Sequence, residues 1–355
     1  MLDVQNDELP FITGRSKDDF KGALLQNGDI IIADTAEDET TGKVCEIVNI
    51  QDKDVVAGLH TMVCRPKNKT AEGYFGYYMN SSSYHHQLLP LMQGIKVLSL
   101  SKTNVQKTTV KYPKDKAEQQ KIADCLRRID TLITLHQRKY EKLVNIKKSM
   151  LDKMFPKNGA SVPEIRFKGF TDPWEQRKLK ELYFQLTERN TDLLPYQKTL
   201  SVATMSFKTD GNGAADTSLA NYKRLRTGDI AFEGHTSKEF RYGRFVLNDV
   251  GDGIMSPRFS ALRPLHEMPI NFWKYYIHYE PIMRKVLVNS TKAGTMMNEL
   301  VINDFLQGSI LVPSMTEQQA IGRFFKQLDT LITLHQRKLE KLQNIKKSCL
   351  EKMFV

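Results

Sequence analysis

The chain has 355 residues, of which 40% are hydrophobic and 26% charged, and its net charge is +11. This composition excludes an intrinsically disordered chain and predicts about two or three globular domains. No run of 18 apolar residues occurs and the first residues are polar and acidic, so we expect a cytoplasmic protein without a membrane span or a secretory signal. The positive charge favours an anionic partner such as nucleic acid, although the solvated faces of two basic helices could equally account for part of it.

The first globular segment, here called the first head, is expected over residues 1–112. Short landmarks mark its strands and helices: Asn27-Gly28-Asp29-Ile30, Arg65-Pro66, Tyr77-Tyr78 and Gly94. His85 and His86 are adjacent, but no third ligand lies at a useful spacing, so we predict no metal site. The four cysteines, Cys45, Cys64, Cys125 and Cys349, show no CxxC spacing, and we expect them to be buried thiols.

A long helix is predicted within residues 113–155. Asp115 and Glu118 fit a capping box at its start, and no glycine or proline interrupts the chain from there to Phe155. Its apolar residues alternate at spacings of three and four, which predicts a heptad seam whose polar gaps are filled by His136 and Lys147. The apolar seam positions are Leu126, Ile129, Ile133, Tyr140 and Leu143.

Residues 156–173 form a linker punctuated by Pro156, Gly159 and Pro163. A second globular segment, the second head, is expected over residues 174–312. The sequence predicts one or two helices, with a helical stretch at 271–287, and strands at 198–205, 228–234, 241–248, 259–264 and 307–313. The second head therefore mixes short strands with helix.

A second long helix is predicted within residues 313–355, with Thr316 and Gln319 as its capping box. Its seam repeats that of the first helix, and Lys346 takes the place of Lys147. The repeated seam positions are Phe325, Leu328, Ile332, His335, Leu339 and Leu342. Polar residues in a seam usually fix register, which is the expected role of the two histidines, with a pH switch as the alternative.

The two helices are near copies of each other. Residues 129–155 and 328–354 are identical at 22 of 27 aligned positions. Two matched seams in one chain should pair, and the intervening head brings the chain back, so we expect an antiparallel pair with a pseudo-twofold axis. The fold class expected is α+β, with two mixed α/β heads joined by two long antiparallel coiled-coil helices.

The heads share an order of landmarks but little sequence. The Gly-Asp-Ile, Arg-Pro, Tyr-Tyr and glycine landmarks of the first head recur at Gly228, Arg263, Tyr275 and Gly294. The second head has roughly 50 residues before its Gly-Asp-Ile landmark and the first has 26 before Asn27. We therefore expect the first head to lack the opening of the second, which is about WEQRKLKELYFQLTERN.

Several features together carry a family resemblance: the linker RFKGFTDPWEQRKL, the paired Gly-Asp-Ile strands, the junctions YPKDKAEQQKIA and VPSMTEQQAIGRFF, and the repeated LDTLITLHQRK. With these features the chain resembles the specificity subunit of type I restriction-modification systems. The resemblance covers essentially the whole chain. It implies a noncatalytic subunit with two target recognition domains that each read half of a bipartite sequence in double-stranded DNA. It also implies helices that dock two methyltransferase subunits, and a complex that includes restriction and translocase subunits.

A DNA-reading head needs cations that position phosphates and a few side chains that reach bases. In the second head the candidates are Lys238, Arg241, Tyr242, Arg244, Arg258, Lys292 and Thr295. A solvated hairpin at 235–244, a structural ion pair at Arg258 and a simple turn near Thr295 are the alternatives. In the first head the candidates are Lys67, Lys69 and Lys96.

No phosphate-binding loop, Pro-Pro methyltransferase core or glycine-rich cofactor fingerprint occurs in the sequence, so we predict no catalytic residues and no bound cofactor. By the same resemblance, S-adenosylmethionine, ATP and Mg²⁺ belong to the partner subunits. The alternative function is a coiled-coil interaction or regulatory protein that reads one half-site or none and still binds methyltransferase subunits.

Overall fold

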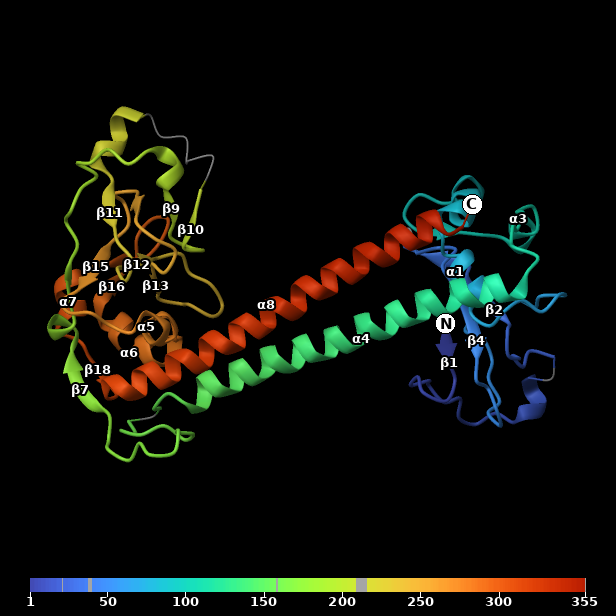
Figure 1. The fold of residues 1–355 in the computed structure, drawn as a ribbon, viewed down its shortest axis with the longest axis horizontal. Coiled ribbons are helices and arrows are strands. Elements are labelled where there is room, and N and C mark those ends of the chain that lie inside the picture. The colour runs from blue at the N-terminus through green and yellow to red at the C-terminus, as the bar shows by residue number, and fades with distance from the viewer. Residues whose placement is uncertain (21, 38–39, 158, 209–215, 355) are drawn as a thin grey trace. The chain divides into compact units, whose positions relative to one another are not determined.

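The computed structural model describes residues 1–355 except 21, 38–39, 158, 209–215 and 355 (Figure 1). The chain divides into two compact units. Unit 1 contains residues 1–140 and 334–355, and unit 2 contains residues 141–333. Each unit therefore combines one head with parts of both long helices.

Unit 1 is built on a four-stranded sheet with the order β1-β4-β2-β5. Its strands are β1 (Leu2–Asp3), β2 (Ile30–Ala33), β4 (Val44–Val48) and β5 (Thr61–Cys64). β1 runs parallel to β4, and the other neighbours are antiparallel. β3 (Thr35–Ala36) pairs separately with β6 (Leu98–Ser99). The short helices are α1 (Tyr74–Tyr78), α2 (Ser82–Leu88) and α3 (Lys102–Val105).

Unit 2 contains an antiparallel sheet with the order β13-β12-β15-β8. Its strands are β8 (Tyr183–Gln185), β12 (Ile230–Glu233), β13 (Arg244–Leu247) and β15 (Ala261–Pro264). Four two-stranded ladders surround it: β7 (Glu175–Lys178) with β18 (Ser309–Val312), β9 (Leu200–Ser201) with β10 (Ser206–Phe207), β11 (Lys223–Leu225) with β14 (Gly253–Met255), and β16 (Thr291–Lys292) with β17 (Glu299–Leu300).

In the described part of the second head, the α-helices are α5 (Ile270–Tyr276), α6 (Glu280–Ser290) and α7 (Ile302–Gln307). The helical stretch predicted at 271–287 is present as α5 and α6, because the chain leaves the helix after α5 and restarts at α6, where a proline occupies the first turn. Short 3-10 helices lie at Lys17–Phe20, Leu89–Leu91, Leu179–Glu181, Tyr196–Lys198 and Asp216–Asn221.

The two heads share one three-stranded core with the same register. β2 lies between β4 and β5 as β12 lies between β13 and β15. Ile30 faces Cys64 in the first head, and Ile230 faces Leu262 in the second. The edges differ, because β1 extends the first sheet beside β4 whereas β8 extends the second sheet beside β15. The predicted internal repeat is thus confirmed at the level of strand order.

Both predicted long helices are present, as α4 (Lys116–Lys153) and α8 (Met315–Lys352). In unit 1, Lys346 Nζ lies 2.6 Å from the Asp130 carboxylate, so the end of α8 contacts the start of α4. In unit 2, Lys147 Nζ lies 2.6 Å from the Asp329 carboxylate, so the end of α4 contacts the start of α8. Within each unit the helix segments are therefore antiparallel, as the matched seams predicted.

The helix starts confirm one predicted cap and correct the other. The Asp115 carboxylate accepts a hydrogen bond from the Ala117 N–H at 2.8 Å. In the second helix the cap is Ser314, whose hydroxyl accepts from the Glu317 N–H at 3.3 Å, and Thr316 lies inside the helix. Ser314 is the position that aligns with Asp115, so the internal repeat identifies the cap better than the local pattern around Thr316.

The hydrophobic cores explain the last residues of each helix. Phe155, just after α4, is buried in the core of unit 2 with Trp174 and Phe272. Phe354, just after α8, is buried in the core of unit 1 with Tyr74 and Tyr78. Each helix therefore ends in an aromatic anchor in a head core.

One cysteine departs from the expected burial. Cys125 is exposed on α4, whereas Cys45, Cys64 and Cys349 are partly buried. The residue that aligns with Cys125 in α8 is Phe324, which packs against Phe167 of the linker. The alignment of Cys125 with Phe324 was a misleading guide to burial, because the equivalent positions on α4 and α8 have different neighbours.

Candidate nucleic-acid interface

Three loops of the second head meet beside the β12–β13 hairpin. They are residues 235–243 between β12 and β13, residues 256–260 between β14 and β15, and the β16–β17 hairpin. The Asn298 N–H donates to the Gly234 carbonyl at 2.9 Å, and its side-chain amide donates to the Arg241 carbonyl at 3.2 Å. Arg258 Nη2 lies 3.6 Å from the sulfur of Met296. These contacts join the three loops into one surface, called here the loop surface.

Five of the sequence candidates lie on the loop surface and are exposed: Lys238, Arg241, Arg258, Lys292 and Thr295. A cavity of about 290 Å³ opens among the loops and is lined by Arg258, Thr295 and Asn298. Of the candidates, Arg258 and Thr295 line this cavity, together with Glu299, and Lys238, Arg241 and Lys292 lie on the same joined loops. This arrangement suits phosphate contacts beside a few contacts to bases.

Arg244 and Tyr242 are less exposed than the other candidates. Arg244 Nη2 donates to the Ala203 carbonyl at 3.0 Å, and its guanidinium lies 4.9 Å from the ring centre of Phe240. Its Nε lies 3.7 Å from the Glu233 carboxylate. The ring of Tyr242 lies beneath Arg241 at 5.9 Å. These contacts hold the base of the 235–243 loop against the sheet.

The first-head candidates are exposed and lie on two loops. Lys67 and Lys69 follow β5, and Lys96 precedes β6. Gly94 starts the turn that carries Lys96, with a φ of +126°, and a Cβ there would clash with the Val97 carbonyl. Gly294 has the same close approach to the Met297 carbonyl. The matched glycines therefore mark tight turns in both heads.

An aspartate–arginine pair explains two of the matched landmarks. Asp29 is buried and accepts from Arg65 Nε and Nη2, both at 2.7 Å. Asp229 is buried and accepts from Arg263 Nε and Nη2 at 2.9 and 2.8 Å. The Gly-Asp-Ile turn is thus clamped to the Arg-Pro strand end in each head by a bidentate pair.

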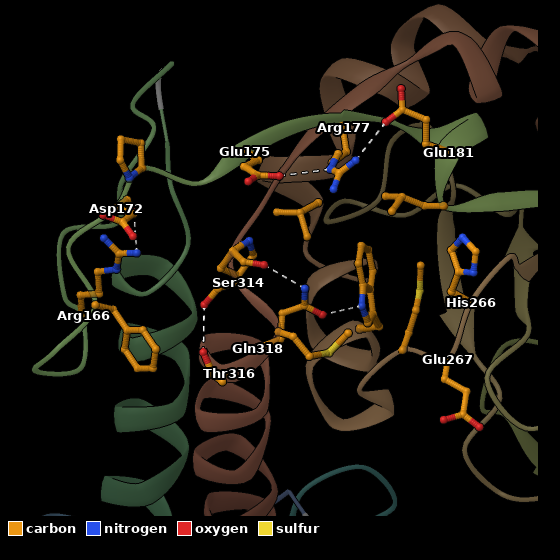
Figure 2. A pocket seen from close by; sticks show the side chains of 18 of the residues that line it. Arg166, Asp172, Glu175, Arg177, Glu181, His266, Glu267, Ser314, Thr316 and Gln318 are labelled. Atoms are coloured by element: carbon orange, nitrogen blue, oxygen red, sulfur yellow. Dashed lines mark hydrogen bonds and ion pairs between the residues drawn. The ribbon is translucent and has the colours of Figure 1, made fainter.

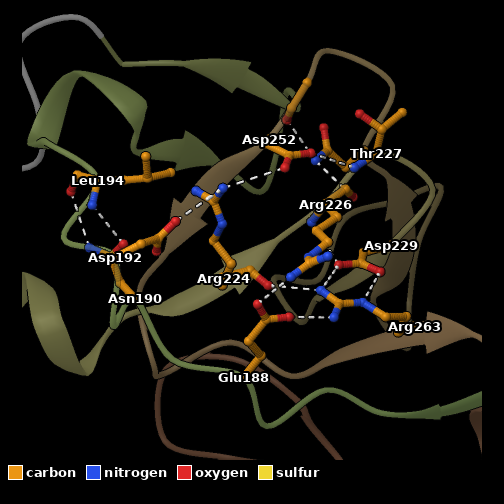
Figure 3. A network of polar contacts seen from close by, with 12 residues as sticks. Glu188, Asn190, Asp192, Leu194, Arg224, Arg226, Thr227, Asp229, Asp252 and Arg263 are labelled. Carbon is orange, nitrogen blue, oxygen red and sulfur yellow. Dashed lines mark hydrogen bonds and ion pairs between the residues drawn. The ribbon is translucent and has the colours of Figure 1, made fainter.

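The second head extends this pair into a network (Figure 3). Glu188 accepts from both Arg263 and Arg226, and Arg224 lies 3.4 Å from the carboxylates of Asp192 and Asp252. Burial raises the pKa of Glu188, but hydrogen bonds from Arg263 and Arg226 outweigh it and hold that pKa below its ordinary value. The network fastens the residues around Glu188 and β11 to the sheet.

A tyrosine–aspartate–lysine set links each head to both helices. Tyr77 donates to Asp130 at 2.9 Å in unit 1, and Tyr275 donates to Asp329 at 2.5 Å in unit 2. The same aspartates bind the lysines of the opposite helix described above. Burial raises the pKa of Tyr275, and Asp329 raises it further, so the phenol stays protonated and donates. These residues include Lys147, one of the polar seam positions.

A buried glutamine closes each junction between head and helix. The Gln318 amide donates to the Pro313 carbonyl at 2.9 Å and accepts from the Trp273 indole at 3.0 Å (Figure 2). Gln119 donates to the Pro113 carbonyl at 2.7 Å and accepts from the Ala71 N–H at 2.9 Å. The repeated Glu-Gln-Gln motif therefore fixes how each helix leaves its head.

The seam residues lie where the helices contact each other or the head cores. The Nδ1 atoms of His136 and His335 are 2.8 Å apart in unit 1. Leu126 belongs to the same core as Phe354, and Met353 packs against that core. In unit 2, Leu143 packs against the core that contains Phe325 and Leu328. Burial lowers the pKa of His335, with His136, Lys139 and Lys338 adding to the effect.

Sequence reasoning missed the Asp–Arg pairs, the glutamine junctions and the Tyr–Asp–Lys sets. Each of these residues was part of a repeated motif, and alignment of the two copies was the signal that could have paired them. In contrast, Asn298 and Met296 join the loop surface through contacts between loops distant in sequence, and nothing in the local pattern indicated them.

Across the described residues, no group of three or more His, Cys, Asp or Glu side chains is placed to hold a metal ion. None of the helices in the same part of the chain is both long and apolar enough to cross a membrane.

Comparison with known proteins identifies the family. The sequence model of the type I restriction modification DNA specificity domain matches residues 3–145 and 172–344. The chain is 21% identical over 360 aligned residues to the type I restriction enzyme MjaX specificity subunit of Methanocaldococcus jannaschii, covering 96% of this chain and 80% of that protein.

A solved structure with a TM-score above 0.5 shows the same fold. The crystal structure of the type I restriction-modification S subunit from M. genitalium matches with a TM-score of 0.58 at 14% identity, over 93% of this chain and 83% of that one. The specificity subunit of Thermoanaerobacter tengcongensis matches with a TM-score of 0.47 at 17% identity, over 93% and 81% of the two chains. With two matching regions that span most of its length, the chain belongs to the type I restriction modification DNA specificity family, whose members recognise DNA and are not catalytic.

Proposed function

We propose that the chain reads an asymmetric, two-part sequence in double-stranded DNA, with one half contacted by each head. The observation that carries this proposal is that two heads with one strand order present different loops. Between β12 and β13 the second head has HTSKEFRYG, which contains exposed Lys238 and Arg241. At the equivalent position between β2 and β4 the first head has DTAEDETTGK, with four acidic residues. Heads with such different loops would read different sequences.

On the loop surface, the cations divide into two roles. Lys238, Arg241 and Lys292 are exposed and would position the DNA through its phosphates. Arg258 and Thr295 line the concavity, from which an arginine can reach a guanine edge and a threonine can reach either base pair. Arg244, with Tyr242 beside it, would position the loop from below.

The first head would use other surfaces, since its equivalent loop is acidic. Its exposed lysines Lys67 and Lys69 follow β5, and Lys96 lies in the turn after Gly94. Lys67 and Lys69 lie at the end of β5, and the turn with Lys96 leads into β6, which pairs with β3 inside the β2–β4 connection. We propose that they supply the phosphate contacts of the first half-site.

The helices would dock two methyltransferase subunits. Each helix carries an exposed pair of leucines one turn apart, Leu132 with Leu135 on α4 and Leu331 with Leu334 on α8. These pairs are identical members of the repeated LITL motif. Exposed leucines repeated on both helices are consistent with two equivalent apolar contact sites. Restriction and translocase subunits would join through that complex, and S-adenosylmethionine, ATP and Mg²⁺ would bind to the partners.

For this role we propose the domain boundaries that the sequence predicts. They are a first recognition domain at 1–112, helical segments at 113–155 and 313–355, a linker at 156–173 and a second recognition domain at 174–312. The recurrence of buried Gln119 and Gln318 next to the prolines at 113 and 313 supports the two boundaries between head and helix.

The test is to reconstitute the chain with its methyltransferase and to map adenine methylation across a genome. The expected result is modification at one split motif with two different halves. A pure, stable complex that methylates no motif would reject the proposal and favour a non-reading interaction protein. A symmetric split motif would contradict the different roles assigned to the two heads.

A further inference from the structure

Each head has a tight turn at an equivalent glycine, called here the glycine turn. A bend of three residues follows Gly94 in the first head and Gly294 in the second. A Cβ at Gly94 would lie 1.9 Å from the Val97 carbonyl oxygen, and a Cβ at Gly294 would lie 2.3 Å from the Met297 carbonyl oxygen. Because only glycine allows so close a return of the backbone, the glycine turn is a shared element of the two heads.

Both glycine turns are attached to the residue that follows the central strand of their head. In the first head, the Leu100 N–H donates to the Asp34 carbonyl at 2.8 Å, directly after β2. In the second head, the Asn298 N–H donates to the Gly234 carbonyl at 2.9 Å, directly after β12. Each glycine turn is therefore held beside the start of the connection that differs most between the heads.

An apolar side chain lies at the tip of each glycine turn. Ile95 is fully exposed and Met296 is 72% exposed, and each is the most exposed of the large hydrophobic side chains in the described part of its head. A single exposed apolar residue is common on protein surfaces. Its recurrence at the same turn, in two heads of otherwise different sequence, indicates that the two tips make the same kind of contact.

A cation lies beside the apolar side chain of each tip. Lys96 follows Ile95 directly, and Arg258 Nη2 lies 3.6 Å from the Met296 sulfur. Burial of these cations against an apolar protein surface would leave them unpaired, which favours DNA as the partner. Because Glu299 lines the same cavity as Met296, a base edge fits that position better than a phosphate does.

The backbone of the glycine turn suits the major groove of DNA. Antiparallel pairing closes each turn, with Gln93 opposite Ser99 in the first head and Lys292 opposite Glu299 in the second. The major groove, about 12 Å wide, admits a two-stranded ribbon of this kind. The apolar group that the bases present in this groove is the 5-methyl group of thymine.

We propose that the tip of each glycine turn enters the major groove of its half-site, and that its apolar side chain packs against the 5-methyl group of a thymine. That side chain is Ile95 in the first head and Met296 in the second. The inference rests on the proposed reading of a two-part DNA sequence and adds a base to each half. Thymine would be preferred there over cytosine, which has no methyl group at that position.

The test uses the full chain in complex with its methyltransferase and duplexes that carry the split motif found by methylation mapping. Replacing each thymine in turn with deoxyuridine removes the 5-methyl group and leaves base pairing unchanged. We expect one such replacement in each half to weaken binding about fourfold, the effect of removing one methyl group from an apolar contact.

Alanine variants assign each methyl group to one head. Ile95→Ala and Met296→Ala should each lose the sensitivity to deoxyuridine in one half of the motif and keep it in the other half. Leu59→Ala and Val288→Ala, which change exposed apolar residues elsewhere in the two heads, are the matched controls and should keep both sensitivities. Circular dichroism should be the same for all four variants.

The outcomes separate this inference from the proposed function. A split motif without thymine in one half, or a deoxyuridine effect that is the same in the wild type and in both tip variants, would overturn the inference and leave the two-part reading intact. Loss of methyltransferase binding by either tip variant would make the tips a protein contact and would also overturn it. A complex that methylates no motif would reject the proposed function, and the inference with it.

Discussion

The two heads show what this chain keeps constant and what it varies. Both heads retain the strand order, the Asp–Arg clamp and the glutamine junction with the helix. The connection after the central strand differs most, being acidic in the first head and basic in the second. Elements that orient a head on its helices are thus shared, and elements at the far end of the strands are free to diverge.

The same clamp also has different surroundings in the two heads. The Arg65 side chain is 50% exposed, whereas that of Arg263 is 20% exposed and binds Glu188 as well as Asp229. Burial raises the pKa of Asp29, but hydrogen bonds from Arg65 and the Gln26 N–H outweigh it and leave that pKa below its ordinary value. A shared motif therefore contributes different amounts of stability to each head.

The largest effect is expected from breaking the shared scaffold. Ile133 and Ile332 are equivalent, half-buried seam residues, and replacing both with aspartate places unpaired carboxylates in the helix contact. We expect the free energy of unfolding to fall by roughly 3–5 kcal/mol and methyltransferase docking to be lost. Urea unfolding and co-purification measure the two effects, with the double leucine variant as control. Docking that survives the double aspartate change would separate the helix pair from the partner site.

The second-largest effect is expected from removing the arginine of the Asp–Arg pair in each head. Arg263→Ala leaves the carboxylates of Asp229 and Glu188 without their main partner, and we expect a loss of roughly 3–5 kcal/mol in unfolding free energy. Arg65→Ala should cost less, because water reaches that pair. Arg226→Ala, which removes an exposed ion pair with Glu188, should cost about 0–1 kcal/mol. Equal losses for Arg263 and Arg65 would show that burial does not distinguish the heads.

The third effect concerns DNA binding by the loop surface. Replacing Lys238, Arg241 and Lys292 with alanine should reduce the slope of log affinity against log salt by roughly one unit for each lost phosphate contact. Binding isotherms at several salt concentrations measure that slope. Lys341→Ala, an exposed change on α8, is the control that should leave it unchanged. An unaltered slope in the triple variant would make the loop surface an ordinary solvated surface.

The smallest effect is a pH dependence of the helix pair in unit 1. The pKa of His335 is lowered from 6.5 by burial and by nearby His136 and lysines, so the unfolded chain binds its proton first as the pH falls. His335 should therefore contribute full stability above pH 6.5, and that contribution should fall as the pH drops below this value. Denaturant unfolding of wild type and His335→Asn between pH 5 and 8 measures the difference. A wild-type midpoint that stays constant over this range would contradict the shift.

Much of the scaffold could be predicted because its signals are local or repeated. The seam, the two helices and the order of landmarks followed from the 199-residue offset between the copies. The cap at Ser314 was missed because both Ser314 and Thr316 could begin a capping pattern at that junction. Only the alignment of Ser314 with Asp115 distinguishes the two. The helical stretch at 271–287 was predicted, but the position of the break between α5 and α6 was not, because the apolar spacing continues through it.

The candidate site was harder to predict because it depends on contacts between loops. Lys238, Arg241 and Arg258 were identifiable as exposed cations. That they lie on one surface with Thr295 depends on Asn298, which donates hydrogen bonds to the Gly234 and Arg241 carbonyls. Arg244 looked like its neighbours in sequence, and only the fold shows its bond to Ala203. Residue type indicated charge, while tertiary contacts decide which charges face outward.

The central claim is that the heads read separate halves of one target. The most direct measurement is the methylation motif produced by a complex in which Lys238, Arg241 and Arg258 are replaced with alanine, compared with the wild-type motif. We predict that specificity relaxes in one half of the motif while the other half and the spacing between them stay the same. Relaxation of both halves, or an unchanged motif with unchanged methylation at every site, would contradict the assignment of the loop surface to one half-site.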